Sequence, residues 1–206
     1  MPRLADHAAR RAALADAVYA LVAREGLHAA SVRAVAAEVG WSPGAVRHYF
    51  SAQHELLAFV MAEMGDRIGA RVVQLRAEQG PGPERARATL EQLLPLDDER
   101  RREVATYLEF VAGGRTDERL APAATDAWRG ERWMVRLALA DVLDLPAPPD
   151  PDTALPATAE VEVPGVHAVV DGLTIAGFLV PGEVDAAVQR DVLARALEGV
   201  AARAGA

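Results

Sequence analysis

Three consecutive side chains near the N-terminus, Arg47, His48 and Tyr49, offer hydrogen-bond donors that suit contact with nucleic acid. Arg47 can bind a guanine edge or a phosphate, and His48 and Tyr49 can donate to phosphate oxygens. Small residues precede these donors, in the order Ser42, Pro43, Gly44 and Ala45. A recognition helix enters the major groove by its N-terminal end, where bulky side chains would hold it away from the bases. The stretch therefore predicts a helix that reads DNA.

Two short helices joined by a turn would position these residues. The first covers residues 31–39 and has an apolar face made of Val32, Val35, Ala36 and Val39. Gly40 permits the backbone to reverse at positive φ. Ser42 then stands at an N-cap position and Pro43 at the first helical position, which are favourable places for both. With Val46 and Phe50 as inward anchors, residues 31–50 are predicted to form a helix-turn-helix.

Residues 31–57 resemble the signature of the TetR family of transcriptional regulators. The match has no gaps and includes Ser31, Ala36, Gly40, Ser42, Gly44, His48, Tyr49, Phe50, Leu56 and Leu57. The run from Ser42 to Phe50 is similar to the BetI-like branch of that family. Two residues depart from the pattern, because Arg47 replaces the usual tyrosine and Gln53 replaces the usual lysine. The expected DNA-binding set is Ser31, Arg33, Ser42, Pro43, Gly44, Ala45, Arg47, His48 and Tyr49.

The rest of the chain has the periodicity of an all-α protein. Apolar spacing predicts helices at about 4–25, 52–79, 84–94, 98–112, 119–143, 165–180 and 183–203. The proline-rich segment 144–164 is expected to be a long, mobile connection without a helix. Together with the motif, this gives about nine helices. The resemblance implies a three-helix DNA-binding head at residues 1–50 and a six-helix body at 51–206 for ligand binding and dimerisation.

The resemblance also implies a homodimer that pairs through the last two helices. The expected interface comprises Val169, Leu173, Phe178, Val188, Val192 and Leu197. The helix at 165–180 is apolar on two sides, which suits a partner surface, although a central core helix of a monomer would look the same. Two recognition helices about 34 Å apart would then read the two halves of a palindromic operator. We expect a repressor that a small molecule releases from this operator.

The resemblance places the effector within the body. Aromatic and basic residues at helical spacing are expected to line its pocket: Tyr107 with Phe110, and Trp128 with Arg132. Acids near the first pair, Glu103 and Glu109, would suit a cationic ligand. The alternative is that these side chains are ordinary core residues.

Composition supports a cytoplasmic regulator. The chain has 206 residues, no cysteine and a net charge of −8. Residues 1–50 are nevertheless slightly basic, with six arginines against four acids, as a separate DNA-facing module would be. The longest apolar run, residues 173–180, is far shorter than the ~20 residues that span a bilayer. No membrane partner is expected.

Two other classes of function were weighed. An enzyme is disfavoured because the chain has no cysteine, nucleophile elbow, phosphate-binding glycine loop or metal-ligand spacing. The histidines at positions 7, 28, 54 and 167 have no carboxylates at fixed offsets, so neither metal nor cofactor is expected. The other class is a dimeric adaptor whose head has lost DNA binding, which Gln53 slightly favours. Asp171 is expected to pair across the dimer or with Arg190 or Arg195.

Overall fold

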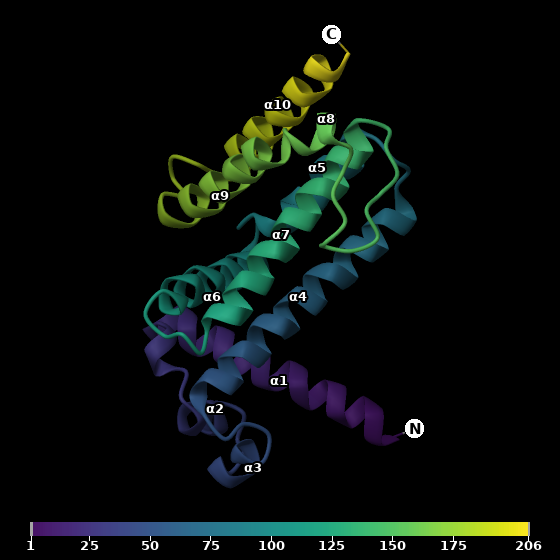
Figure 1. Ribbon diagram of the computed structural model, residues 1–206. Helices are drawn as coiled ribbons and strands as arrows, with labels where there is room; N and C mark the ends of the chain where they lie inside the picture. The colour runs from purple at the N-terminus through teal and green to yellow at the C-terminus, as the bar shows by residue number, and fades with distance from the viewer. Residues whose placement is uncertain (1, 206) are drawn as a thin grey trace. The chain divides into compact units, whose positions relative to one another are not determined.

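The computed structural model describes the backbone of residues 2–205 and the side chains of residues 9–205, and every regular element in that range is helical. The α-helices are α1 (Pro2–Glu25), α2 (Val32–Glu38), α3 (Pro43–Arg47), α4 (Gln53–Glu78), α5 (Pro83–Leu90), α6 (Asp98–Gly114), α7 (Ala121–Val142), α8 (Ala157–Glu160), α9 (Val163–Leu179) and α10 (Ala186–Ala204). Figure 1 shows their order along the chain. The all-α prediction is confirmed, and the one-turn α8 is the element that the sequence did not indicate.

The chain divides into two compact units. One contains residues 1–67 and 105–127, and the other contains residues 68–104 and 128–206. The boundaries between these units fall inside α4, α6 and α7. The end of the head at residue 50 stays a prediction. The first unit joins α1–α3 to the beginning of α4 and the C-terminal part of α6.

The first unit has its own apolar core. Helix α1 ends at Gly26, whose φ of 82° is the left-handed conformation that glycine adopts without steric cost. The apolar side chains buried in this unit come from α1, α2, α3, α4 and α6. This core includes Leu14, Val18, Leu21, Val22, Val35, Val46, Leu56, Leu57 and Phe110.

The second unit is built around the C-terminal half of α7, where Met134, Val135 and Leu137 to Ala140 are buried. Helices α9 and α10 lie side by side (Figure 1) and contribute Val166, Val170, Leu193 and Leu197 to the same core. Asp141 lies within this unit with its side chain only 2% exposed. Its carboxylate accepts hydrogen bonds from Arg76 at 2.7 Å and from Nε of Arg85 at 3.0 Å. Two arginines thus compensate one buried acid.

The proline-rich segment between α7 and α9 is packed, so the prediction of a mobile connection was wrong. The indole N–H of Trp133 donates to the carbonyl of Pro148 at 3.0 Å, and Arg136 donates to the carbonyl of Pro151 at 2.8 Å. Leu155 is buried. Proline prevents a long helix here, but its carbonyls remain free to accept hydrogen bonds from α7.

Residues 157–179 are long and apolar enough to resemble a membrane span by length and composition. In the structure, seven residues of α9 are buried inside the second unit, among them Val166, Val170 and Leu173. A buried core helix can have the same composition, and 39% of the apolar window is buried here.

Candidate nucleic-acid interface

Helix α2 begins with a side-chain cap. Ser31 is the N-cap residue, and its Oγ accepts a hydrogen bond from the backbone N–H of Ala34 at 3.1 Å. Val35 and Ala36 are fully buried, while Arg33 is exposed on the opposite side of the helix. Gly40 then adopts a φ of 70°, which allows the chain to turn sharply toward α3. The predicted first half of the motif is therefore present.

Helix α3 begins in the same way. Ser42 Oγ accepts a hydrogen bond from the N–H of Ala45 at 3.1 Å, and Pro43 occupies the first turn. The helix is shorter than predicted, since it ends at Arg47, and His48 and Tyr49 lie in the turn that follows. Val46 and Phe50 are buried, which confirms their prediction as anchors.

The anchors attach α3 to the beginning of α4. The rings of Phe50 and Phe59 have their centroids 4.9 Å apart, within the range of a favourable aromatic pair. The guanidinium of Arg11 lies 4.6 Å from the centroid of the Phe59 ring, and its Nε donates to Glu63 at 2.9 Å. The buried Val46 of α3 and this aromatic pair lie on the inner side of the motif.

Two further contacts fix the ends of the neighbouring helices. Arg24 of α1 forms a two-pronged hydrogen bond to Glu38 of α2, at 3.1 and 2.9 Å. This hydrogen bond lowers the pKa of Glu38. At the start of α4, Glu55 accepts from the N–H of Ser51 at 2.7 Å and from its hydroxyl at 2.9 Å. These hydrogen bonds from Ser51 lower the pKa of Glu55, so the carboxylate stays charged beside the helix N-terminus.

With the inner side of the motif buried, its predicted contact residues face outward together. Ser31 is half-buried, and the other members are exposed: Arg33, Ser42, Pro43, Gly44, Ala45, Arg47, His48 and Tyr49. A short helix with a bare N-terminal end and a basic side chain at its last residue can approach a nucleic-acid groove closely. Gln53, where the family pattern has lysine, is exposed at the first residue of α4.

The four residues predicted to line an effector pocket lie in different settings. In the first unit, Phe110 is only 1% exposed and belongs to the core, whereas Tyr107 is half-buried. In the second unit, Trp128 is 45% exposed. Its ring lies 5.6 Å from the guanidinium of Arg132, and Arg132 also donates to Glu160 at 3.1 Å.

A cleft of about 490 Å³ lies elsewhere in the first unit. None of the four predicted residues lines it. Its walls come from the turn after α1, the start of α4 and the C-terminal end of α6, and they include His28, Gln53, His54, Glu109 and Asp117. Arg119 pairs with Asp117, and this hydrogen bond lowers the pKa of Asp117 to about 2. Sequence reasoning missed this cleft because its walls come from distant segments.

The residues predicted for a dimer interface divide into two groups. Leu173 and Leu197 are 6% and 2% exposed within a single chain, so their side chains lie in the core of the second unit. Val169, Phe178 and Val192 are half-buried, and Val188 is 40% exposed. The outer face of α9 carries a stripe at alternating spacings of three and four, consisting of Gly165, Ala168, Gly172, Ile175 and Leu179, all of them exposed.

The expected partners of Asp171 are also different. Arg190 contacts Glu91 and Arg195 pairs with Asp191, whereas Asp171 faces His167 one turn earlier on α9. The sequence does contain this i, i+4 pair, so the statement that His167 lacks a carboxylate at a fixed offset was wrong. The side chain of His7 lies outside the described residues.

Two protein families match this chain. Residues 14–60 match the family described as "Bacterial regulatory proteins, tetR family", and residues 83–202 match "BetI-type transcriptional repressor, C-terminal". The chain is similar to the HTH-type transcriptional regulator PksA of Bacillus subtilis, with 31% identity over 90% of this chain and 86% of PksA. It is 27% identical to the HTH-type transcriptional regulator BetI of Vibrio campbellii over 94% of this chain and 92% of that protein.

Solved structures share the fold. A transcriptional regulator from Rhodococcus sp. Rha1 superposes with a TM-score of 0.73 and 29% identity, covering 92% of this chain and 95% of that one. A transcriptional regulator from Saccharomonospora viridis, solved in complex with choline, gives a TM-score of 0.71 at 17% identity over 93% of this chain and 95% of that one. The second likeness is one of fold alone.

Proposed function

Because this chain belongs to the TetR family of transcriptional regulators and has a BetI-type C-terminal domain, we propose that it is a homodimeric repressor that a small organic molecule releases from a palindromic operator. The observation that carries the proposal is the row of exposed residues in the motif, with Val46 and Phe50 buried behind it. This row consists of Arg33, Ser42, Pro43, Gly44, Ala45, Arg47, His48 and Tyr49. A DNA-binding regulator of bacteria acts on the chromosome, so we place it in the cytoplasm. It is not an enzyme.

Within the row, Arg47 has the leading role. It is exposed at the end of the short α3, where a guanidinium can make two hydrogen bonds to a guanine edge. Arg33, His48 and Tyr49 would contact phosphates, which set the register of the protein on DNA but carry no sequence information. The bare Gly44 and Ala45 allow α3 to lie deep in the groove. The charge that a lysine would supply at position 53 is then supplied by Arg47.

Dimerisation uses the outer face of α9. The exposed stripe of Gly165, Ala168, Gly172, Ile175 and Leu179 has the spacing of a helix–helix seam, and its small residues permit close approach. Val180 and Val188 extend the apolar area, at 47% and 40% exposed. This stripe replaces the buried Leu173 and Leu197 in the interface that we propose.

The sequence pattern does not locate the effector site. We propose that the effector binds in the cleft of the first unit. Glu109 on one wall gives it a negative group suited to an organic cation, while the charge of Asp117 is balanced by Arg119. A regulator of this fold has been solved with choline, which makes choline a reasonable first probe. A ligand here would touch Gln53 and His54 at the start of α4, directly after the DNA-contacting row.

Release requires that the effector bind the DNA-free conformation more tightly than the DNA-bound one. The experiment is fluorescence anisotropy with a labelled fragment from upstream of the protein's own gene, at low salt, with and without choline. Sequence-specific binding supports the repressor, and loss of binding with choline supports the effector class. A protein that binds no fragment, even at low salt, would be the adaptor that the sequence left open.

A further inference from the structure

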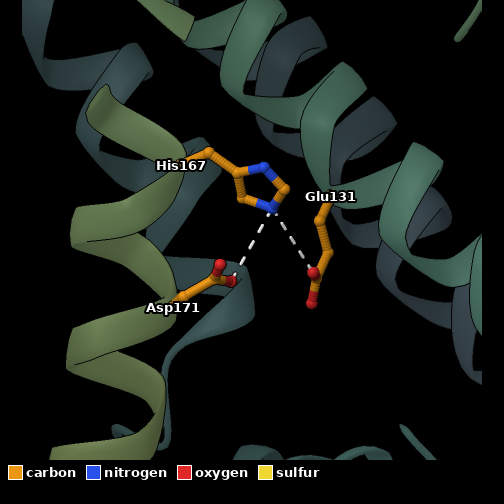
Figure 2. A group of neighbouring side chains, drawn as sticks. All are labelled: Glu131, His167 and Asp171. Atoms are coloured by element: carbon orange, nitrogen blue, oxygen red, sulfur yellow. Dashed lines mark ion pairs between the residues drawn. The ribbon is translucent and has the colours of Figure 1, made fainter. Parts of the chain in front are cut away.

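Helices α7 and α9 bring together three side chains that DNA binding does not use. His167 and Asp171 lie one turn apart on α9, and Glu131 faces them from α7 (Figure 2). His167 Nε2 is 3.6 Å from a Glu131 carboxylate oxygen and 3.7 Å from an Asp171 carboxylate oxygen. One atom from each of the three residues lies within 4.8 Å of the other two.

The imidazole is the unusual member of the cluster. The His167 side chain is only 5% exposed, and its Nε2 is buried without a hydrogen-bond partner. A buried polar atom without a partner is destabilising, so such atoms are uncommon unless something binds them. Figure 2 shows this nitrogen directed between the two carboxylates, at distances too long for a hydrogen bond to either.

We propose that Glu131, His167 and Asp171 bind a divalent first-row transition metal ion, with Zn²⁺ as its simplest representative. Atoms bound to one such ion at about 2.1 Å lie roughly 3.0–3.4 Å apart, and the observed separations from Nε2 exceed this by only a few tenths of an ångström. Two carboxylates balance the charge of the ion. The imidazole nitrogen favours zinc, iron, nickel or copper over magnesium and calcium, which prefer oxygen ligands.

The surroundings suit a site with one open position. The Asp171 side chain is 47% exposed, which leaves a route for the ion and for a water ligand, whereas Glu131 is 13% exposed. The ring of Trp128, one turn before Glu131 on α7, lies 5.5 Å from the His167 ring and covers one side. A metal ion at this point would join α7 to α9 within the second unit.

The proposal is independent of DNA binding, and its test uses no DNA. Metal-free full-length protein is titrated with Zn²⁺ by calorimetry, and Co²⁺ is added separately because its visible absorption reports direct coordination. We expect one Zn²⁺ per chain, loss of this binding in His167→Gln, and an affinity at least tenfold lower in Asp171→Asn and Glu131→Gln. Mg²⁺ is expected to give no comparable binding. The control is Glu198→Gln, which removes an exposed carboxylate of α10 outside the cluster.

Asp171 keeps the test decisive if His167→Gln proves unstable, because its side chain is half-exposed and its loss leaves α9 packed. Zn²⁺ binding that is equal in the wild type and Asp171→Asn would overturn the proposal. So would the absence of Zn²⁺ binding, or binding that disappears in Glu198→Gln. The three side chains would then contribute only to the packing of α7 on α9, and the three variants would alter stability without any dependence on metal.

Discussion

Ser42 Oγ accepts a hydrogen bond from the N–H of Ala45 at 3.1 Å, and Ser31 Oγ accepts one from Ala34 at the same distance. Both helices of the DNA-contacting motif thus begin with the same side-chain cap. For α3, which has only five residues, a cap satisfies a large share of its free backbone donors. The outer side of α3 is exposed, so the orientation of Arg47 depends on how well this short helix is formed.

Removing the cap of α3 by Ser42→Ala should lower the free energy of unfolding by about 1 kcal/mol, the usual value of a serine N-cap. We also expect weaker DNA binding, because α3 would be less ordered before it reaches the groove. Urea unfolding and anisotropy measure the two effects. Ser42→Thr keeps a capping hydroxyl and serves as the control; an equal loss in both variants would show that the cap is not responsible.

The buried carboxylate of Asp141 should matter far more to stability. Asp141→Ala leaves Arg76 and Arg85 without their shared partner inside the second unit, and removing one member of a buried pair costs about 3–5 kcal/mol. Thermal and urea unfolding measure this cost. The comparison is Asp191→Ala, whose pair with Arg195 is more than half exposed and should contribute less than about 1 kcal/mol. Equal effects would contradict the assignment.

Glu160 should make stability depend on pH in the acid range. Its carboxylate accepts hydrogen bonds from Arg136, the N–H of Leu155 and Arg132, and these lower its pKa below the ordinary 4.5. A lowered pKa gives stability that is present above the ordinary value and is lost as the pH falls through the folded value. Glu160→Gln should therefore lower the unfolding free energy at pH 7, by about 1–3 kcal/mol for charge-assisted hydrogen bonds. The difference from wild type should shrink toward pH 3; a difference that stays constant would argue against this origin.

If the exposed stripe on α9 forms the dimer interface, one charged side chain placed in it should disrupt the dimer. Leu179 is 65% exposed, and Leu179→Arg should shift the protein toward a monomer, because an unpaired charge would be buried at the seam. Sedimentation or light scattering measures the mass. Val73→Arg changes a residue that is 71% exposed on α4, outside the stripe, and should leave the mass unchanged. A wild-type protein that is monomeric, or a dimeric Leu179→Arg variant, would refute the interface.

Local features could be predicted from the sequence, and relationships between distant segments could not. Gly26, Gly40 and the Ser42–Pro43 pair mark helix ends by their own backbone preferences, so the structure has those ends where the sequence indicated them. The anchors Val46 and Phe50 followed from helical periodicity.

The features that the sequence did not predict all depend on packing between distant segments. Which side of α9 faces its own core depends on α7 and α10, and the apolar pattern of α9 by itself does not show that Leu173 is buried. Glu131 and His167 are 36 positions apart in sequence and meet only through the packing of α7 on α9. The proline-rich segment packs because Trp133 and Arg136 bind its carbonyls, which no local pattern in the segment reveals.

The central claim is that Arg47 reads DNA, and the affinity of Arg47→Ala for a fragment containing the operator tests it most directly. Arg47→Ala should bind about 5- to 150-fold more weakly than the wild type, since a two-pronged contact to guanine contributes about 1–3 kcal/mol. Arg115→Ala removes the same charge from an exposed residue outside the motif and should bind as the wild type does. Unchanged affinity in Arg47→Ala, or an equal loss in Arg115→Ala, would contradict the claim.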